Sequence, residues 1–314
     1  MNAVLNESHG KDFALYHGDS TEVLSHFPDD SIDFIIYSPP FATLYTYSNS
    51  ERDLGNSRNY EEFCAHYSFI AKELYRVLKP GRLASVHCMN LPTTIQHHGH
   101  IGLQDFRGDL IRQHQVDGFI YHSEVCIWKD PVTAMQRTKA IGLLHKQLCK
   151  DSTLSRQGIP DYLVTFRKPG ENMAPVAGQL TQYAGTEDLP LTNDETRRSI
   201  EIWQRYASPV WFDINPSLTL QRESAREEAD ERHICPLQLQ VIERALQLWT
   251  NPCDIVLSPF AGIGSEGYVS VKANRKFIGI ELKESYWQQS VLNLQRAEIE
   301  SGQQSILLFD GEEL

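Results

Sequence analysis

The chain has 314 residues, of which 41% are hydrophobic and 22% are charged. This composition is ordinary for a folded protein and excludes collagen-like, low-complexity and wholly disordered classes. Domains typically run ~100–200 residues, so the length fits one large domain with an insertion or two modest domains. No run approaches the ~20 apolar residues of a membrane helix, and the first residues lack a basic-then-hydrophobic pattern. We therefore expect a cytoplasmic protein with no membrane partner.

The net charge of -12 is unevenly distributed along the chain. Residues 129–168 hold eight Lys and Arg against three Asp, a local balance of +5, and the rest of the chain carries -17. A basic zone on an acidic body suits a surface that faces phosphates, and a solvated helical face is the equal alternative. The candidates for phosphate contact in this zone are Lys129, Arg137 and Lys139.

Short β-rich runs alternate with segments of helical period, which predicts an α/β domain with a largely parallel sheet. Strands at residues 13–17 and 32–37 bracket a short helix around residues 20–26. Apolar spacings of three and four predict a helix over residues 60–78, which ends at a Lys-Pro-Gly sequence. Further strands are expected at residues 82–88, 118–128 and 161–166.

Between residues 168 and 233 the pattern breaks up, because eight Pro and Gly residues interrupt any period. This segment is interpreted as an insertion with its own small fold. Regularity then returns with a helix at residues 236–249, a strand at 254–257, a helix to 273, a strand at 276–280 and a helix at 284–299. The chain is accordingly divided at residues 1–168, 169–232 and 233–314.

A Gly-rich segment, SPFAGIGS at residues 258–265, lies between a predicted strand and a predicted helix. Glycines there let the backbone approach a ligand closely, and the helix N-terminus offers free N–H groups. Glu281 stands at the end of the next strand, where an acid commonly holds ribose hydroxyls. The combination predicts a nucleoside-containing cofactor, with a tight structural turn and a surface acid as the alternative.

A second motif, SPPF at residues 38–41, directly follows an apolar strand. Its two prolines remove two N–H donors, so the segment displays carbonyl oxygens as acceptors, followed by an aromatic face. Such a loop could grip a planar ring that bears an amino group. A proline pair is also a common way to end a strand.

Together the two motifs resemble S-adenosylmethionine-dependent DNA methyltransferases that modify exocyclic amino groups, whose signatures are (D/N/S)PP(Y/F/W) and (D/S)PFxGxG. The catalytic motif comes first here, as in the permuted beta subgroup, and phage and prophage members look especially similar. The likeness extends over most of the chain, through HGDS, RVLKPG, DYLVTFRKP, HICPLQL and KFIGIELKESYW. It implies a doubly wound, mostly parallel Rossmann-like sheet with circularly permuted motifs. Residues 1–168 would be the catalytic part, 169–232 a target-recognition insertion and 233–314 the cofactor-binding part.

The resemblance also implies residue roles around an S-adenosylmethionine cofactor. Glu281 would take the ribose hydroxyls, Asp19 would lie near the adenine, and Pro236 belongs to a segment over the methionine end. Ser258 departs from the commoner Asp at its position. The remaining cofactor contacts are Phe260, Gly262 and Gly264, and the catalytic residues are Ser38, Pro39, Pro40 and Phe41.

The expected reaction is methyl transfer to cytosine N4 of a flipped-out base in double-stranded DNA. Ser38 and the Pro39 carbonyl would accept the amino hydrogens and Phe41 would stack on the base. The alternatives are adenine N6, a protein glutamine side chain, or a regulator that binds the cofactor without turnover. Restriction–modification is the expected context, and a homodimer is common among similar proteins. We expect no metal, since the histidines at 97, 98 and 100 have no carboxylate or thiol at ligand spacing.

Overall fold

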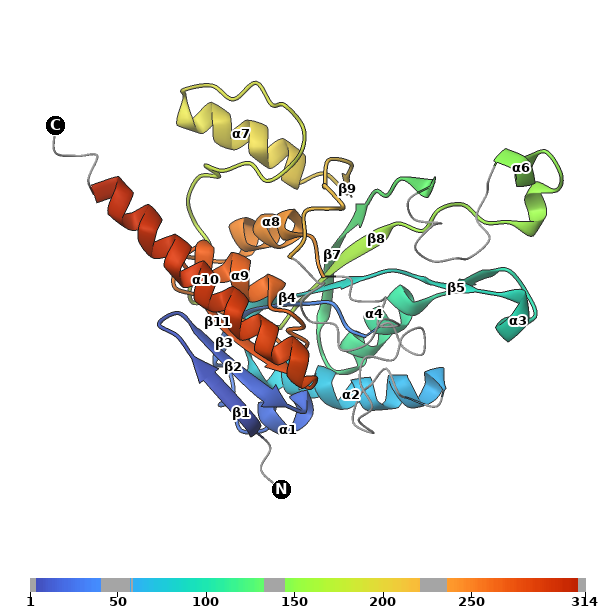
Figure 1. Ribbon diagram of the computed structural model, residues 1–314, viewed down its shortest axis with the longest axis horizontal. Coiled ribbons are helices and arrows are strands. Elements are labelled where there is room, and N and C mark those ends of the chain that lie inside the picture. The colour runs from blue at the N-terminus through green and yellow to red at the C-terminus, as the bar shows by residue number, and fades with distance from the viewer. Residues whose placement is uncertain (1–3, 41–56, 58, 133–144, 221–235, 310–314) are drawn as a thin grey trace.

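The computed structural model describes residues 4–40, 57, 59–132, 145–220 and 236–309. Nine of the described strands form one sheet, in the spatial order β1-β2-β11-β10-β3-β4-β8-β7-β9 (Figure 1). Their bounds are β1 (Val4–His9), β2 (Phe13–Gly18), β3 (Ile32–Tyr37), β4 (Leu78–Cys88), β7 (Ile120–Ile127), β8 (Asp161–Arg167), β9 (Val210–Trp211), β10 (Ile255–Ser258) and β11 (Lys276–Glu281). Outside this sheet, β5 (Leu91–Thr93) pairs with β6 (Gly102–Gln104).

The middle of the sheet is parallel and its two ends are mixed. Strands β2, β11, β10, β3 and β4 run parallel to one another. At the two ends, β1 is antiparallel to β2, β8 is antiparallel to both β4 and β7, and β9 is parallel to β7. The described helices are α1 (Ser20–Leu24), α2 (Tyr60–Val77), α3 (Ile95–His98), α4 (Phe106–Val116), α6 (His145–Leu148), α7 (Glu195–Tyr206), α8 (Leu239–Trp249), α9 (Ser265–Lys272) and α10 (Glu284–Phe309).

Strand β3 shows how helices cover both faces of the sheet. All six of its residues are buried, and successive side chains point to opposite faces. Ile35 and Tyr37 pack into a core with α1, α2 and α4, whereas Phe34 and Ile36 pack into a second core with α8, α9 and α10. A parallel strand buried on both faces is typical of doubly wound folds, so this part of the prediction is confirmed.

Helix α2 begins and ends where the sequence predicts. The side chain of Asn59 accepts a hydrogen bond of 2.8 Å from the backbone N–H of Glu62, which caps the first turn. Its buried face includes Phe63, Ile70 and Leu74, at helical spacing. The helix leads directly into β4, which includes the Lys-Pro-Gly sequence and therefore begins before the strand expected at residues 82–88.

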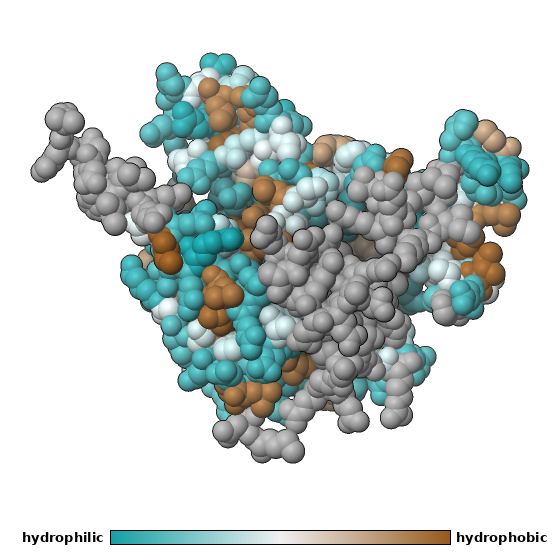
Figure 2. All heavy atoms as spheres, viewed as in Figure 1, coloured by the Kyte–Doolittle hydropathy of each residue, from teal (hydrophilic) through white to brown (hydrophobic). Residues whose placement is uncertain are grey.

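The segment after residue 168 packs against α8 through the side chain of Arg244. Helix α7 projects from the body in Figure 1, and hydrophilic side chains cover much of its described surface in Figure 2. Arg244 of α8 is fully buried beneath it, and its Nε donates to the carbonyl of Ala184 at 2.6 Å. Its guanidinium also pairs with Asp213 and lies 4.9 Å from the rings of both Tyr206 and Trp211.

Among the described residues, no helix is long and apolar enough to cross a membrane.

Candidate active site

Parallel pairing brings the two predicted motifs to one edge of the sheet. Strand β10 pairs with β3 through Val256 with Phe34 and Leu257 with Ile35. Because both strands run in the same direction, the loops after them leave the sheet side by side. Ligands of open α/β sheets bind at this carboxyl edge.

Residues next to the ends of β3 and β2 contact the Gly-rich loop directly. The ring of Tyr37, the residue before the SPPF motif, lies 5.7 Å from the ring of Phe260. From the end of β2, the Ser20 hydroxyl donates a hydrogen bond to the carbonyl of Pro259. The three strand ends therefore hold the Gly-rich loop against the start of the catalytic motif.

The structure brings Gly262 and Glu281 together, as their predicted roles require. Gly262 has a positive φ of 53°, and no described atom lies within 4 Å of the place a Cβ would occupy. Its N–H donates to Oε2 of Glu281 at 2.8 Å, and the N–H of Lys283 donates to Oε1 at 2.9 Å. A carboxylate fixed by two backbone donors beside open space is suited to accept hydroxyls from a ribose.

Gly264 is required by packing. Its φ is 83°, and a Cβ there would lie 2.8 Å from Leu294 and 3.0 Å from Ser290, both on α10. The glycine lets α10 pack against the start of α9. A direct cofactor contact of Gly264 stays a prediction.

Two buried polar atoms near the cofactor elements lack a hydrogen-bond partner among the described residues. They are Oγ of Ser258, at the end of β10, and Oε1 of Gln238, two residues after Pro236. Unsatisfied buried polar atoms are uncommon and call for a ligand or a solvent partner. Together with the Gly262 loop, they fit a cofactor that has both a nucleoside and a polar amino-acid end.

The side chain of Asp19, directly after β2, caps the N-terminus of α1. Its Oδ1 accepts hydrogen bonds from the backbone N–H groups of Thr21 at 2.9 Å and Glu22 at 3.1 Å, which caps α1. Its position near an adenine stays a prediction.

A buried carboxyl group lies next to the Gly-rich loop. Glu266 lies in the first turn of α9 and is fully buried. Burial raises the pKa of Glu266 to about 8, with the charge of Glu281 as a further cause.

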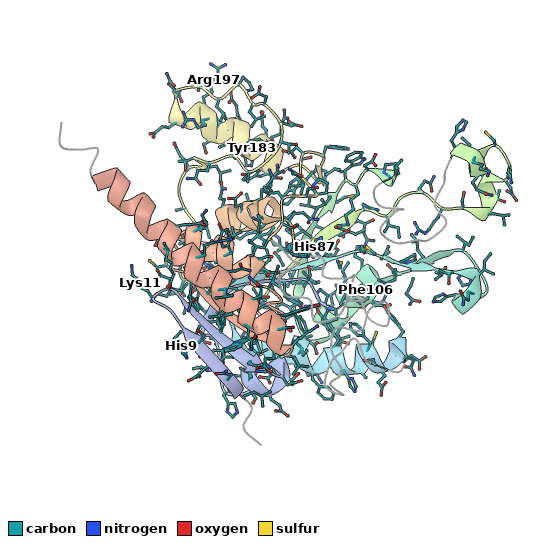
Figure 3. All side chains as sticks on the ribbon, in the orientation of Figure 1. His9, Lys11, His87, Phe106, Tyr183 and Arg197 are labelled. Atoms are coloured by element: carbon teal, nitrogen blue, oxygen red, sulfur yellow. The ribbon has the colours of Figure 1, made fainter. Side chains whose placement is uncertain are left out.

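In the SPPF motif, Ser38 is the first member of a chain of polar side chains. Its Oγ lies 2.8 Å from Nδ1 of His87, near the end of β4, and Nε2 of His87 lies 3.1 Å from Oδ2 of Asp161. The ammonium of Lys129 pairs with the same carboxylate oxygen. Figure 3 labels His87 near the centre of the molecule, where these strands meet.

The sheet topology explains how these four residues meet. Ser38 follows β3, which runs parallel to β4. Asp161 begins β8, which is antiparallel to β4, so the start of β8 lies at the end of β4. Lys129 follows β7, whose Ile127 pairs with Asp161. The sequence motifs did not identify His87 and Asp161 as site residues. The signal that could have identified them is that each is a polar residue at or next to the end of a predicted strand.

Asp161 is a buried anion. Its side chain is 2% exposed, and that of Lys129 is 20% exposed. Burial would raise the pKa of Asp161, but the charge of Lys129 and the contact with His87 lower it to about 2. The second carboxylate oxygen, Oδ1, is buried and has no hydrogen-bond partner among the described residues.

Several predicted residues are not brought into this geometry. Phe41, Arg137 and Lys139 lie outside the described residues. Lys129, assigned to the basic zone, pairs with Asp161, and a DNA contact of this side chain stays a prediction. In the described chain, no group of three or more His, Cys, Asp or Glu could hold a metal ion.

The order of the strands defines a Rossmann-like, doubly wound α/β fold. The sequence pattern of the DNA methylase family of N6 and N4 methyltransferases matches residues 32–292. The chain belongs to this family of S-adenosylmethionine-dependent DNA amino-methyltransferases, which confirms the expected family and its cofactor.

Individual relatives are distant. The chain is 27% identical to the Type II methyltransferase M.BglII of Bacillus subtilis, over 87% of its own length and 66% of that protein, just under two thirds. It is 24% identical to the DNA adenine methyltransferase YhdJ of Escherichia coli, over 87% and 79% of the two chains. The structure of the cytosine-N4-specific PvuII DNA methyltransferase, from Proteus hauseri, is similar in fold, with a TM-score of 0.61, 16% identity and 95% of each chain covered.

Proposed function

We propose that this protein transfers the methyl group of S-adenosylmethionine to an exocyclic amino group of a base in double-stranded DNA. The observation that carries the proposal is the parallel pairing of β3 with β10, which puts Ser38 and the Gly262 loop at one edge of the sheet. One loop presents acceptors for an amino group, and the other has the geometry expected for the nucleoside of the cofactor.

The chemistry of an aromatic amine explains the residue types at the catalytic loop. The nitrogen lone pair of cytosine or adenine is delocalised into the ring, so the amine is a poor nucleophile. Ser38 and the carbonyl of Pro39 would each accept an N–H hydrogen bond and stabilise the positive charge that develops on nitrogen. Bound S-adenosylmethionine supplies a methyl group activated on a sulfonium. Holding the amine in line with that methyl group supplies proximity.

Cytosine N4 is the proposed target, with adenine N6 as the second candidate. Ser38 at the first motif position favours cytosine, since adenine-modifying relatives more often have Asp there. YhdJ is named a DNA adenine methyltransferase, which favours the second candidate. A serine hydroxyl can donate to the ring nitrogen beside the amino group of cytosine, which a carboxylate cannot do. A hydroxyl that donates to His87 cannot make this second hydrogen bond, so the contact of Ser38 with His87 does not favour cytosine.

DNA recognition is assigned to elements around this edge of the sheet. The base must rotate out of the duplex to reach Ser38, and Phe41 would stack on it. Residues 169–232 would read the target sequence, and Arg137 and Lys139 would contact phosphates. Two aromatic side chains of the recognition segment, Trp203 and Phe212, are 54% and 64% exposed and are candidates for base contacts. A restriction–modification context and a homodimer belong to the same proposal.

The test is to incubate the purified protein with S-adenosylmethionine and DNA of mixed sequence, digest the DNA to nucleosides and identify the products by mass. Detection of N4-methylcytosine supports the proposal in full. Detection of N6-methyladenine would change the proposed target base and leave the rest of the proposal intact. Methylated protein glutamine without methylated DNA would favour the glutamine alternative. Cofactor binding without any product would favour a regulator.

A further inference from the structure

We infer that His87 and Asp161 form a relay with Ser38, which fixes the serine hydroxyl as an acceptor and takes up the proton released by the methylated amine. This inference rests on the proposed function and names two positioning residues for it. Its basis is the continuous contact from Ser38 through His87 to Asp161. Lys129 completes the chain by pairing with Asp161.

The carboxylate decides which nitrogen of His87 carries the proton. An ionised Asp161 can only accept, so the ring nitrogen that faces it, Nε2, must donate. In the neutral ring, Nδ1 then holds a lone pair and accepts the hydroxyl hydrogen of Ser38. Both lone pairs of the Ser38 oxygen remain available for the amino group of the base.

The relay accounts for the proton in methyl transfer. As the amino nitrogen forms its bond to the methyl carbon, the methyl–sulfur bond breaks and its electron pair stays on sulfur. The nitrogen then loses a proton to Oγ of Ser38, and the hydroxyl proton of Ser38 moves to Nδ1 of His87. The positive charge that began on sulfur ends on the imidazolium of His87, beside the anion of Asp161, and leaves to solvent after the reaction.

Incomplete hydrogen bonding of a buried carboxylate distinguishes this chain of contacts from an ordinary structural pair. Ser85 and Thr165 join the same two strands, β4 and β8, with their hydroxyl oxygens 3.0 Å apart, and lie deeper in the sheet. Asp161 instead leaves Oδ1 buried without a described partner. A buried carboxylate oxygen without a hydrogen-bond partner destabilises the folded state, and here it belongs to the carboxylate that contacts His87.

A double-mutant cycle tests the coupling of His87 to Ser38. We expect His87→Gln, which keeps an amide near Nε2 but removes Nδ1, to lower the single-turnover rate of DNA methylation by ~10- to 100-fold. The Kd for S-adenosylmethionine should stay unchanged. In a Ser38→Ala background the same change should lower the rate by less than ~3-fold, since the residue it acts through is gone. Asp161→Asn, which keeps the shape of the side chain, should behave in the same way.

The matched control is Thr165→Val, which removes a buried hydrogen bond between the same strands without touching His87. It should change the melting temperature and leave the methylation rate within ~2-fold in both backgrounds. If His87→Gln does not fold, the cycle with Asp161→Asn decides the question. Equal factors in the two backgrounds would overturn the relay while leaving the methyltransferase proposal intact. No methylated nucleoside from the wild-type protein would overturn both.

A second measurement reads the relay without turnover. Nitrogen-15 NMR of histidine-labelled protein assigns the His87 ring as the signal that disappears in His87→Gln, and that signal should show a proton on Nε2 and a bare Nδ1. A proton on Nδ1 of His87 would contradict the relay, because Nδ1 could not then accept from Ser38.

Discussion

The hydroxyl oxygen of Ser38 lies 2.8 Å from Nδ1 of His87, although 49 residues separate the two in the chain. The contact follows from the parallel pairing of β3 with β4, whose carboxyl ends meet at one edge of the sheet. The position of the Ser38 side chain is therefore fixed by a residue of the neighbouring strand β4. Ser38 can therefore act as a preorganised acceptor, which is what stabilising a developing charge requires.

Ser38→Ala should separate catalysis from cofactor binding. We expect turnover to fall by ~10-fold or more, because an acceptor used mainly in the transition state is lost. The Kd for S-adenosylmethionine, measured by calorimetry, should be unchanged. A variant with full turnover would remove Ser38 from the catalytic machinery.

Glu281→Ala should weaken S-adenosylmethionine binding by ~10-fold or more, because each charge-assisted hydrogen bond to the ribose contributes ~1.5–3 kcal/mol. Glu298→Ala is the matched control, since Glu298 also accepts a backbone N–H, from Asp12 at 2.8 Å, in another part of the fold. Calorimetry should find a loss of affinity in the first variant alone. Equal affinity of both folded variants would place Glu281 outside the site.

The two glycines of the cofactor loop should respond differently to alanine. At Gly262 the new methyl group meets no described atom within 4 Å, so Gly262→Ala should lower cofactor affinity and cost only the ~1–2 kcal/mol of a positive φ. At Gly264 the methyl group would press on Leu294 and Ser290, so Gly264→Ala should lose more stability. Thermal unfolding and calorimetry of both variants check the contrast. The reverse order of stability loss would contradict this assignment.

Glu266→Gln should change how stability depends on pH. The folded protein keeps a proton on Glu266 up to a pKa of about 8, whereas the unfolded chain releases it near 4.5. The free energy of unfolding of the wild type therefore falls as pH rises from 4.5 to 8. The variant lacks this loss, so its advantage in urea unfolding should grow by on the order of 1–3 kcal/mol between pH 5 and pH 8. The control is Glu284→Gln, at an exposed acid in α10. A difference between Glu266→Gln and the wild type that stays constant with pH would refute the raised pKa of Glu266.

Neutralising Arg137 and Lys139 together should flatten the salt dependence of DNA binding by up to ~2 units on a log–log plot, because two phosphate contacts would be lost. Neutralising Lys72 and Lys276, both exposed and outside the basic zone, should leave the slope unchanged. An identical slope for the two double variants would place Arg137 and Lys139 away from the DNA.

The strands that carry the site could be predicted because their local patterns are strong. β3 and β10 are short apolar runs bounded by turn signals, and each is followed by a motif of restricted backbone. Strand β1 was not predicted, since it is an edge strand with mostly exposed residues and no clear alternation. Helix α4 was also missed, because its many polar residues and Gly108 weaken the helical pattern.

The partner of Ser38 could not be found from motifs because it depends on the order of strands. His87 lies one residue before the end of a predicted strand and Asp161 begins another, but only antiparallel pairing of β8 with β4 puts those two positions together. A largely parallel sheet, as expected from the alternation of elements, would separate them by the length of a strand. Lys129 illustrates the same limit. The distribution of charge along the sequence predicted that Lys129 belongs to a basic zone, but it could not predict the ion pair of Lys129 with Asp161.

The central claim is that the edge of the sheet formed by β3 and β10 transfers a methyl group from the cofactor to a base. The most direct measurement incubates DNA with S-adenosylmethionine that carries a trideuterated methyl group, using the wild-type protein and Ser38→Ala in parallel. The DNA is then digested and its nucleosides are analysed by mass. The account predicts a methylated cytosine nucleoside that carries all three deuterium atoms, formed by the wild type and strongly reduced in the variant. A deuterated adenine nucleoside would correct the base alone, and the absence of any deuterated nucleoside with the wild type would contradict the account.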